Sequence, residues 1–394
     1  MTTPHTNRLV ALLAGLVLSG LSLGVLAQAQ LNYPALTDGP AFNDGAARDD
    51  ERPRSRLVIN AALDTPLIAP LLEDFQRRNP DIEIVYRNLS TLAVYRTFLD
   101  AGAAERADVV MSSAMPWQYW LANNGYAQPL DSAAARAWPA WARWRQELFA
   151  ITFEPVVIVY RRDVAERFGA IDSHADLLER LERHAEALRG RVVTYDPATS
   201  GAGYSYAIEE ARLSPRYWEL VAALGRVDTA LVGTTREMLE GLAQGRYWIG
   251  YNLLGSYARE FAREHPELEV VVPKDYALVT HRLAFIARDA RNPYAARRFL
   301  DYLLSEYGQR AIGRLTPLGT IHPALSGPGS ANALRERLGD ALRPIDIGPG
   351  LLATLDNLKR EALLSRWRRE FQRAAPSADI PAAALDVPPS EAAR

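Results

Sequence analysis

The chain of 394 residues is long enough for two domains, because a single hydrophobic core usually stops growing at roughly 250–300 residues. A hydrophobic content of 48% and a charged content of 23% are typical of a soluble globular protein, and a formal net charge of −2 gives no reason to expect nucleic acid as a partner. The absence of cysteine excludes disulfides, zinc–thiolate sites and thiol catalysis.

The N-terminus has the sequence pattern of an export signal. Arg8 precedes an apolar run from Leu9 to Leu26, and Ala27-Gln28-Ala29 has the small-x-small pattern that signal peptidase reads. We therefore expect residues 1–29 to be a cleaved signal peptide and the mature protein to be periplasmic. An uncleaved membrane anchor is the alternative, since about 18 apolar residues approach the length of a membrane span. Residues 30–55 are expected to be a flexible tail, and residues 375–394, rich in Ala and Pro, a disordered one.

Strand and helix patterns alternate from Leu57 onward. Residues 57–60 are typical of a buried strand, and a helix is predicted to follow with Thr65 as its N-cap and Pro66 as its first residue. Strand patterns at 82–86 and 107–111 are each followed by another helix. This alternation predicts an α/β fold with a parallel sheet, in which ligands bind beyond the carboxyl ends of the strands.

Two long strand patterns divide the chain. Residues 149–160 are predicted to cross into a second domain, and residues 276–287 to cross back. The expected division is residues 56–153 for the first part of lobe 1, 154–275 for lobe 2, and 276–374 for the return to lobe 1 and its C-terminal helices. Residues 351–371 have the pattern of an amphipathic closing helix.

Three tryptophans, Trp138, Trp141 and Trp144, recur every three residues. This spacing favours a helix face packed on the core, and an aromatic platform for a sugar or a base is the alternative.

The common catalytic motifs are absent, with no H-E-x-x-H, Walker loop or G-x-G-x-x-G. Residues 203–207, GYSYA, nearly match a nucleophile elbow, so an exported hydrolase that uses Ser205 remains one hypothesis. The histidines are scattered, and we expect a non-enzymatic protein with no metal and no cofactor.

Four loops that follow a strand pattern and precede a helix carry small polar residues. A loop of this kind can simply cap its own helix, but four together favour a binding site for a small anion, which amides and hydroxyls at helix N-termini can hold. Because Gly201 and Gly203 lack a Cβ, the backbone there is expected to take unusual angles and to let a ligand approach closely. Arginines at 87, 161 and 282 could contact the anion, although a surface position is expected for each. The predicted ligand-binding residues are Asp64, Thr65, Ser112, Ser113, Thr199, Ser200, Gly201, Gly203, Tyr251 and Asn252.

The sequence resembles a known family in these same regions. The pattern VVTYDPATSGAGY, the pair Tyr251-Asn252 and the segment VVPKDYALVTHRLAFIARDARNPYAARRFLDYLLSEYGQ are similar to the extracellular solute-binding proteins of ABC transporters. The similarity covers roughly residues 56–325 and points to the group of ferric-iron, phosphonate and phosphorylated-sugar binding proteins. It implies a type 2 periplasmic-binding-protein fold, in which two α/β lobes joined by two crossing strands close on the ligand like a Venus flytrap.

The same resemblance implies a function. The chain would be a monomeric substrate-binding component that captures a small anionic solute, an organic phosphate, a phosphonate or a carboxylate, and delivers it to a permease in the inner membrane. An accessory protein that signals to a membrane histidine kinase is one alternative, and a ferric-iron binding protein is another. Iron binders of the family use two adjacent tyrosines, whereas Tyr251 is followed here by Asn252 and the next tyrosine is Tyr257, so an organic anion is favoured.

Overall fold

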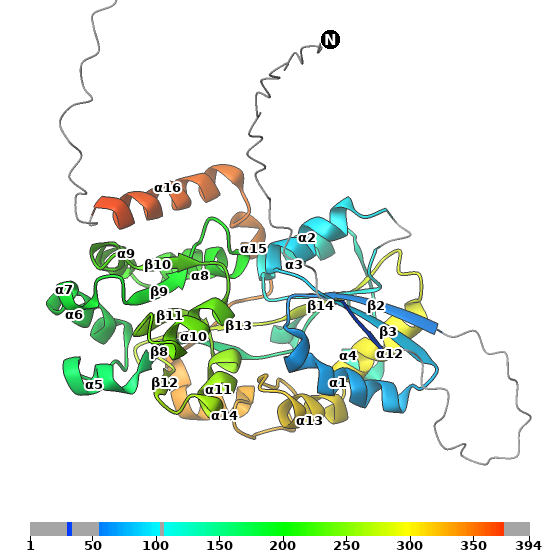
Figure 1. The fold of residues 1–394 in the computed structure, drawn as a ribbon. Helices are drawn as coiled ribbons and strands as arrows, with labels where there is room; N and C mark the ends of the chain where they lie inside the picture. Colours follow the sequence, from blue (N-terminus) through cyan, green and yellow to red (C-terminus); the bar gives the residue numbers. More distant parts are fainter. Residues whose placement is uncertain (1–29, 34–54, 103–105, 374–394) are drawn as a thin grey trace, which may run out of the picture.

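The computed structural model describes residues 30–33, 55–102 and 106–373, and the expected signal peptide and C-terminal tail lie outside these ranges. The described residues form two α/β lobes, each built on its own β-sheet and lying side by side in Figure 1. The α/β prediction is confirmed. Within the described ranges, no helix is both long enough and apolar enough to cross a membrane.

The first lobe is built on a sheet of eight strands in the order β1-β3-β2-β4-β14-β7-β6, with β5 paired to β14. Its parallel part is the one that the strand–helix alternation predicts, because β2 pairs in parallel with both β3 and β4. The late strand β14 runs antiparallel between β4 and β7. The strands are β1 (Gln30–Tyr33), β2 (Ser55–Ala61), β3 (Ile82–Asn88), β4 (Val109–Ser112), β5 (Ala127–Gln128), β6 (Arg143–Trp144), β7 (Leu148–Ala150) and β14 (Leu283–Ala287). The helices are α1 (Thr65–Arg78), α2 (Thr91–Asp100), α3 (Met115–Asn123), α4 (Ala133–Ala137), the 3₁₀ turn η1 (Ala140–Ala142), α12 (Pro293–Leu304) and α13 (Glu306–Leu315).

One part of the expected flexible tail is ordered. Residues Gln30–Tyr33 form strand β1, which pairs antiparallel with β3, and Leu31 packs against the core of the first lobe. The pairing gives the backbone of this short polar segment hydrogen-bond partners that its composition does not reveal.

The second lobe is built on a sheet of seven strands in the order β10-β9-β11-β8-β13-β15, with β12 paired to β8. The register between β11 and β8 shifts between Gly250 and Leu253, and Asn252 has a left-handed backbone with φ 65°. The strands are β8 (Glu154–Arg161), β9 (Val192–Tyr195), β10 (Ala230–Val232), β11 (Ile249–Leu254), β12 (Leu268–Val271), β13 (Ala277–Thr280) and β15 (Leu342–Pro344). The helices are α5 (Arg162–Phe168), α6 (His174–Arg183), α7 (Ala185–Leu188), α8 (Gly201–Leu213), α9 (Tyr217–Arg226), α10 (Thr235–Ala243), α11 (Gly255–Glu264), α14 (Ala331–Leu338) and the 3₁₀ turn η2 (Gly339–Ala341).

Two adjacent segments join the lobes. Residues 151–153 lead from β7 into β8, and residues 281–282 lead from β13 into β14. The backbone N–H of Ile151 donates a hydrogen bond of 2.9 Å to the carbonyl of Arg282, so the two crossings run against each other. These are the two crossing segments that the sequence predicts.

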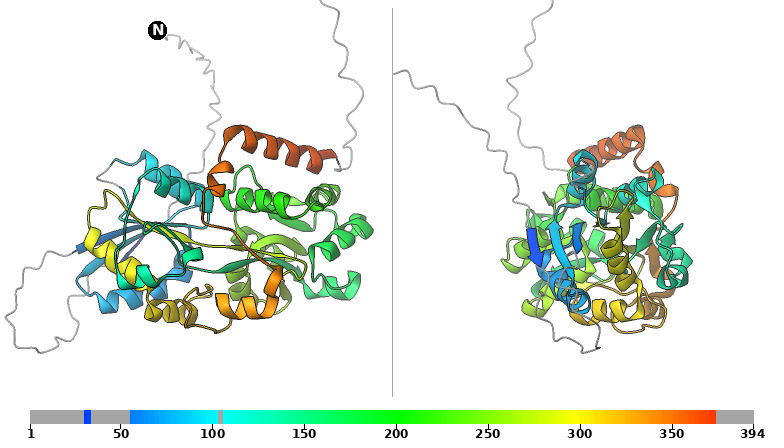
Figure 2. Two further views of the ribbon diagram at one scale, coloured as in Figure 1. Left: turned by 180° about the vertical axis from the view of Figure 1, so that it is seen from behind. Right: turned by 90° about the vertical axis from the view of Figure 1, so that its right-hand side faces the viewer.

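The C-terminal part of the chain differs from the expectation that residues 276–374 belong to the first lobe. After α13, the chain returns to the second sheet, where β15 pairs in parallel with β13. Helix α15 (Gly350–Ala353) then packs on α3 of the first lobe, and α16 (Asn357–Arg373) packs on α9 of the second. Figure 2 shows this C-terminal strap, residues 350–373, lying across one side of both lobes. The amphipathic pattern predicted the helix α16 but could not identify the surface that covers it.

The tryptophan run is not a single helix face. Helix α4 ends at Ala137, so the three rings do not share one helix. Trp138 is buried in the core and its indole N–H donates to the carbonyl of Ala150 at 3.0 Å, as the packing interpretation expects. Trp141 is half-exposed, and the Arg335 guanidinium lies 4.2 Å from the centre of its ring.

Candidate functional site

The crossing segments hold a buried ion pair at the boundary between the lobes. Glu154 and Arg282 have side chains that are 0% and 1% exposed, and Nη1 of Arg282 donates to Oε1 of Glu154. The Thr152 hydroxyl donates to the same carboxylate oxygen at 2.8 Å, and the Ser256 hydroxyl donates to the other. Burial alone would raise the pKa of Glu154, but the Arg282 charge and these hydroxyls lower it, so Glu154 stays ionised. Arg282 is therefore a buried hinge residue and not the expected surface charge.

Polar atoms without a partner surround this ion pair. In the described part of the chain, the Tyr206 hydroxyl, the Thr280 hydroxyl and Nε of Arg282 are buried and have no hydrogen bond of good geometry. The Tyr206 and Thr280 hydroxyls lie close enough to interact with each other, and Tyr206 also interacts electrostatically with Arg282. An unsatisfied buried polar group costs about 1–3 kcal/mol, so a polar solute that reached these atoms would be stabilised.

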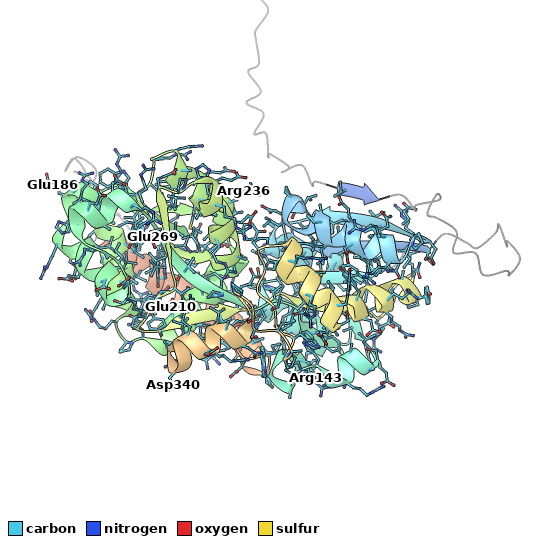
Figure 3. The ribbon with its side chains drawn as sticks, turned by 90° about the horizontal axis from the view of Figure 1, so that it is seen from below. Arg143, Glu186, Glu210, Arg236, Glu269 and Asp340 are labelled. Atoms are coloured by element: carbon cyan, nitrogen blue, oxygen red, sulfur yellow. The ribbon has the colours of Figure 1, made fainter. Side chains whose placement is uncertain are left out.

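Asp64 connects the lobes above the hinge. Its carboxylate Oδ2 accepts from Nε of Arg236 at 2.7 Å, and its backbone N–H donates to the Tyr257 hydroxyl at 3.0 Å. Arg236 lies at the edge of the second lobe that faces the first (Figure 3). Because its carboxylate is engaged by Arg236 of the other lobe, Asp64 makes no side-chain cap to α1, although it occupies the N-cap position expected for Thr65. Thr65 begins the helix, and its Oγ1 is another buried atom without a partner among the described residues.

The N-terminus of α8 also meets the first lobe. Ser200 caps the helix, and its hydroxyl oxygen accepts from the Gly203 N–H at 3.2 Å. A Cβ added to Gly201 would lie 3.0 Å from Oγ1 of Thr91 in the first lobe, and one added to Gly203 would lie 2.5 Å from Cβ of Tyr195. Neither glycine has a positive φ, so the expectation of unusual backbone angles was wrong. Gly201 thus allows close packing where the lobes touch, whereas Gly203 allows α8 to pack closely on Tyr195 of its own lobe.

Ser112 and Ser113 lie at this contact, whereas Thr199 is turned away from it. The Ser112 hydroxyl oxygen accepts from the backbone N–H of Ala114 at 3.1 Å, and Cβ of Ala114 is 3.4 Å from the position of a Cβ on Gly201. Thr199 is exposed, and its hydroxyl donates to Oδ2 of Asp196 in the same loop at 3.1 Å. The structure therefore brings the Ser112-Ser113 loop and the Ser200-Gly201 loop together and leaves Thr199 in a local turn.

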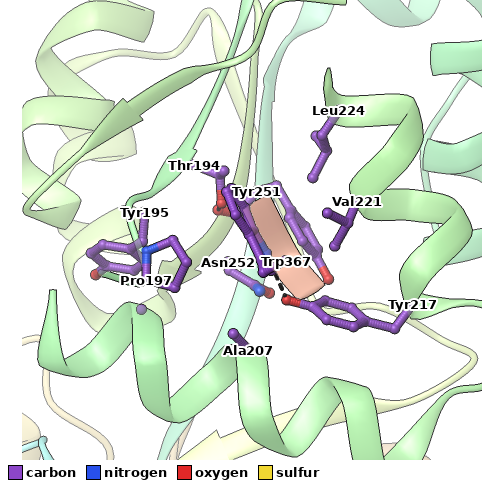
Figure 4. A pocket seen from close by; sticks show the side chains of 11 residues that line it. Thr194, Tyr195, Pro197, Ala207, Tyr217, Val221, Leu224, Tyr251, Asn252 and Trp367 are labelled. Carbon is purple, nitrogen blue, oxygen red and sulfur yellow. Dashed lines mark hydrogen bonds between the residues drawn. The ribbon is translucent and has the colours of Figure 1, made fainter. Parts of the chain in front are cut away.

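Tyr251 and Asn252 are not part of this interface. Both line a separate cavity of about 20 Å³ under α16, room for about one water molecule, with Trp367 and Tyr217 on its other side (Figure 4). The Tyr251 ring makes an edge contact with His174 at 5.8 Å and belongs to the core beneath α6 and α9. Tyr251 lies on the same side of β11 as Ile249, two residues earlier, whereas Leu253, beyond the register shift, packs in a different part of the core.

The positions of Tyr251 and Tyr257 argue against the ferric-iron alternative. Tyr251 faces the core of the second lobe, whereas Tyr257 faces Asp64 and Arg282, so the two phenols do not form a pair. Burial raises the pKa of Tyr257 to about 12 and that of Tyr251 as well, which keeps both phenols protonated at neutral pH. The described residues contain no group of three His, Cys, Asp or Glu side chains arranged to hold a metal.

A cluster of charged groups lies behind Tyr251, away from the lobe interface. Nδ1 of His174 is 3.0 Å from Asp275, its Nε2 is 3.6 Å from Glu210, and its ring stacks on Tyr276 at 4.0 Å. Burial lowers the pKa of His174, but the two carboxylates outweigh it and raise this pKa to about 9. His174 is therefore a cation that neutralises buried carboxylates of the second lobe.

Ser205 has a structural role in α8. Its side chain is 3% exposed, and its hydroxyl donates to the Gly201 carbonyl one turn earlier at 2.9 Å. A serine that bonds back to its own helix in this way is not activated by a base.

Sequence reasoning missed most of the side chains that meet between the lobes. They come from different elements, and each resembles an ordinary strand, helix or cap residue on its own; the missed residues are Thr91, Glu154, Tyr206, Arg236, Tyr257 and Thr280. The sequence does contain one indication that Arg282 is buried. Arg282 and its neighbour His281 interrupt a strand pattern that is otherwise mostly apolar, and a solvent-exposed charge is unusual in such a strand.

Comparison with known proteins decides the family. Residues 57–314 match the family model described as bacterial extracellular solute-binding protein. This chain belongs to that family. A solved structure described as the substrate-binding protein of the ABC transporter from Agrobacterium tumefaciens is 34% identical, with a TM-score of 0.80 over 88% of this chain and 99% of that one. A comparison with curated proteins gave no match.

More distant members share the fold. Iron-bound HitA from Pseudomonas aeruginosa is 18% identical, with a TM-score of 0.64 over 80% of this solute-binding protein and 99% of HitA. AfuA from Actinobacillus pleuropneumoniae, solved with fructose-6-phosphate, is 16% identical, with a TM-score of 0.66 over 81% and 99%. The predicted two-lobed periplasmic-binding-protein fold is thereby confirmed, as is the resemblance to the group that includes iron and sugar-phosphate binders.

Proposed function

We propose that this solute-binding protein captures a small anionic solute between its lobes in the periplasm and delivers it to an ABC permease in the inner membrane. The solute would be a carboxylate, a phosphonate or an organic phosphate. Family membership and the likeness to an ABC transporter's substrate-binding protein support the transport role.

The observation that carries the anion proposal is the group of buried polar atoms at the hinge that lack a hydrogen bond of good geometry. Nε of Arg282 can only donate a hydrogen bond, and the hydroxyls of Tyr206 and Thr280 can donate as well as accept. Such a donor set suits the oxygens of a carboxylate or a phosphoryl group. Glu154 already balances the Arg282 charge, so the site offers directed donors more than net positive charge. A singly charged anion therefore fits this site better than a doubly charged one, because it brings less negative charge that the site would have to neutralise.

The interlobe contacts support capture by closure. Asp64, Arg236 and Tyr257 join the lobes on one side, and Gly201 meets Thr91 on another. A solute that contacts both lobes at once binds only the closed form and therefore shifts the population toward it.

A thermal-shift screen tests the anion proposal. Monocarboxylates, di- and tricarboxylates, phosphonates and sugar phosphates would be compared with neutral sugars and ferric salts, and a ligand at 100 times its Kd adds about 2.7 kcal/mol to stability. The proposal fails if no anion raises the melting temperature while a neutral sugar or ferric ion does.

Two variants localise the ligand that the screen finds. Tyr206→Phe removes a hydroxyl from the proposed site, whereas Tyr251→Phe removes a similarly buried hydroxyl of the same lobe that lies outside the site, toward Glu210. We expect the first change to raise the Kd of the anion by about tenfold, the value of one hydrogen bond to a charged group, and the second to leave it unchanged. The reverse result would move the site to the Tyr251 cavity.

A further inference from the structure

A second cavity lies on a different side of the second lobe from the Tyr251 cavity. Its volume is about 280 Å³, near the lower end of the range of small-molecule pockets at about 300–1,000 Å³. It is enclosed by β8, β12, α11 and α14, the last of which faces the viewer of Figure 3. Its lining residues differ from those that join the two lobes.

The floor of this cavity is apolar. Pro155 and Val157 of β8 and Val270 of β12 line it, with Val272 just beyond the end of β12. Leu334 of α14 closes the cavity from the opposite side. A surface of this kind favours the hydrocarbon part of a ligand.

Two guanidinium groups stand at its wall. Arg259 of α11 and Arg337 of α14 both line the cavity, and in the described part of the chain neither has a carboxylate within ion-pair distance. Arg263, one turn after Arg259 on α11, differs in this respect, because it pairs with Glu260 at 2.6 Å. The cavity therefore carries positive charge that the described residues do not neutralise.

Arg259 is held in place with donors left over. Its Nη2 donates to the carbonyl of Pro317 at 3.0 Å. Gly329 has a φ of +82°, and a Cβ at this position would lie only 3.0 Å from Nη1 of Arg259. The glycine thus leaves room for the guanidinium beside the loop.

The surroundings of Arg259 destabilise the positive charge of its guanidinium group. Burial lowers the pKa of Arg259, Glu154 acts against this effect, and the charges of Arg337 and Arg263 lower the pKa further. An anion between the two arginines of the cavity would compensate the buried charge and offset the repulsion.

We propose that this cavity binds a small amphipathic carboxylate, a single carboxyl group carried on an aliphatic or aromatic body. The body packs on the valine floor, and the carboxylate lies between Arg259 and Arg337, whose planar guanidinium groups match its two oxygens. This ligand is distinct from the solute held between the lobes.

The proposal is tested by isothermal titration of the purified protein with octanoate. Acetate has the same charged group without the body, and 1-octanol has the body without the charge. We expect saturable binding of octanoate at one site, with at least tenfold weaker binding of both acetate and octanol. Equal binding of octanol would overturn the role of the arginines.

Variants assign the binding to this cavity. Arg337 is exposed, so Arg337→Gln leaves the core intact and should weaken octanoate binding by about tenfold or more, the value of one charge-assisted hydrogen bond. Arg263→Gln is the matched control, because it removes a neighbouring arginine that does not line the cavity, and it should change the Kd less than twofold. Octanoate binding that survives Arg337→Gln but is weakened by Tyr206→Phe would place octanoate between the lobes and refute the second site. The Tyr206→Phe result with the screened anions tests the interlobe site separately.

Discussion

The buried ion pair between Glu154 and Arg282 is expected to be the most sensitive point of the hinge. Glu154→Gln keeps the shape of the side chain and removes its charge, which leaves the Arg282 guanidinium buried with no counter-ion beside it. Removal of one partner from a buried pair costs about 3–5 kcal/mol, because the remaining charge is neither solvated nor compensated. The hydrogen bonds from Thr152 and Ser256 also weaken, since they no longer end on a charged oxygen.

Urea unfolding measures this loss. Tryptophan fluorescence and far-UV circular dichroism should give coincident transitions, and the free energy of unfolding of Glu154→Gln should be lower than that of the unsubstituted protein by about 3–5 kcal/mol. Glu260→Gln is the control, because it breaks an exposed pair with Arg263 that is worth about 0.2–1 kcal/mol. A double replacement, Glu154→Leu with Arg282→Met, should cost less than the sum of the single changes, since no charge is left unpaired. A loss below about 1 kcal/mol for Glu154→Gln would refute the reasoning.

Three further predictions concern other parts of the fold. Arg236→Gln removes the partly exposed ion pair with Asp64, which is worth about 0.2–1 kcal/mol. The change should raise the radius of gyration of the ligand-free protein, measured by small-angle X-ray scattering. An unchanged radius would show that this pair does not hold the lobes together. The pKa of His174 is raised to about 9, so its interactions stabilise the fold fully below pH 6.5, and this contribution, on the order of 3 kcal/mol, is lost as the pH rises from 6.5 to 9. The pKa of buried His281 is lowered to about 4, so the free energy of unfolding falls as the pH drops from 6.5 to 4. Urea midpoints across both pH ranges should therefore vary less in His174→Gln above pH 6.5 and in His281→Gln below it, and identical pH profiles would contradict the assignment. Trp367→Ala leaves a cavity between α16 and α9 and should cost about 3–5 kcal/mol locally, seen as faster hydrogen exchange in these two helices and unchanged exchange in the first lobe.

The parallel part of the first sheet could be predicted because its signals are local. Apolar runs at Leu57, Ile82 and Ala107 are each followed by a helix start within a few residues, and the observed register joins these strands in parallel. Gly201 lies where the lobes touch because of its small size and not because of its backbone angles, whereas Gly203 packs on Tyr195 of its own lobe. Short-range patterns of this kind depend only on residues near one another in sequence.

The residues between the lobes could not be assembled in the same way. Glu154 and Arg282 stand 128 positions apart, so neither indicates that the other will be buried beside it. Tyr251 has the place of a loop residue after a strand in the sequence pattern, but it lies inside β11, and its side chain joins that of Ile249 in the core of the second lobe. A polar residue within an apolar run of sequence indicates that its side chain needs a hydrogen-bond or ionic partner, but the sequence does not show which residue supplies it.

The position of β14 in the first sheet sets the order in which the protein can fold. This strand lies between β4 and β7, yet it is among the last parts of the first lobe to be synthesised. The strands β8 to β13 of the second lobe form an uninterrupted stretch of chain and can pair beforehand. Until Leu283–Ala287 arrives, β4 and β7 present open edges that can pair with other chains. The first strands of the first sheet emerge early, yet this sheet is completed only after most of the second sheet has been made, and a chain cut short before Leu283 would leave β4 and β7 with unpaired edges.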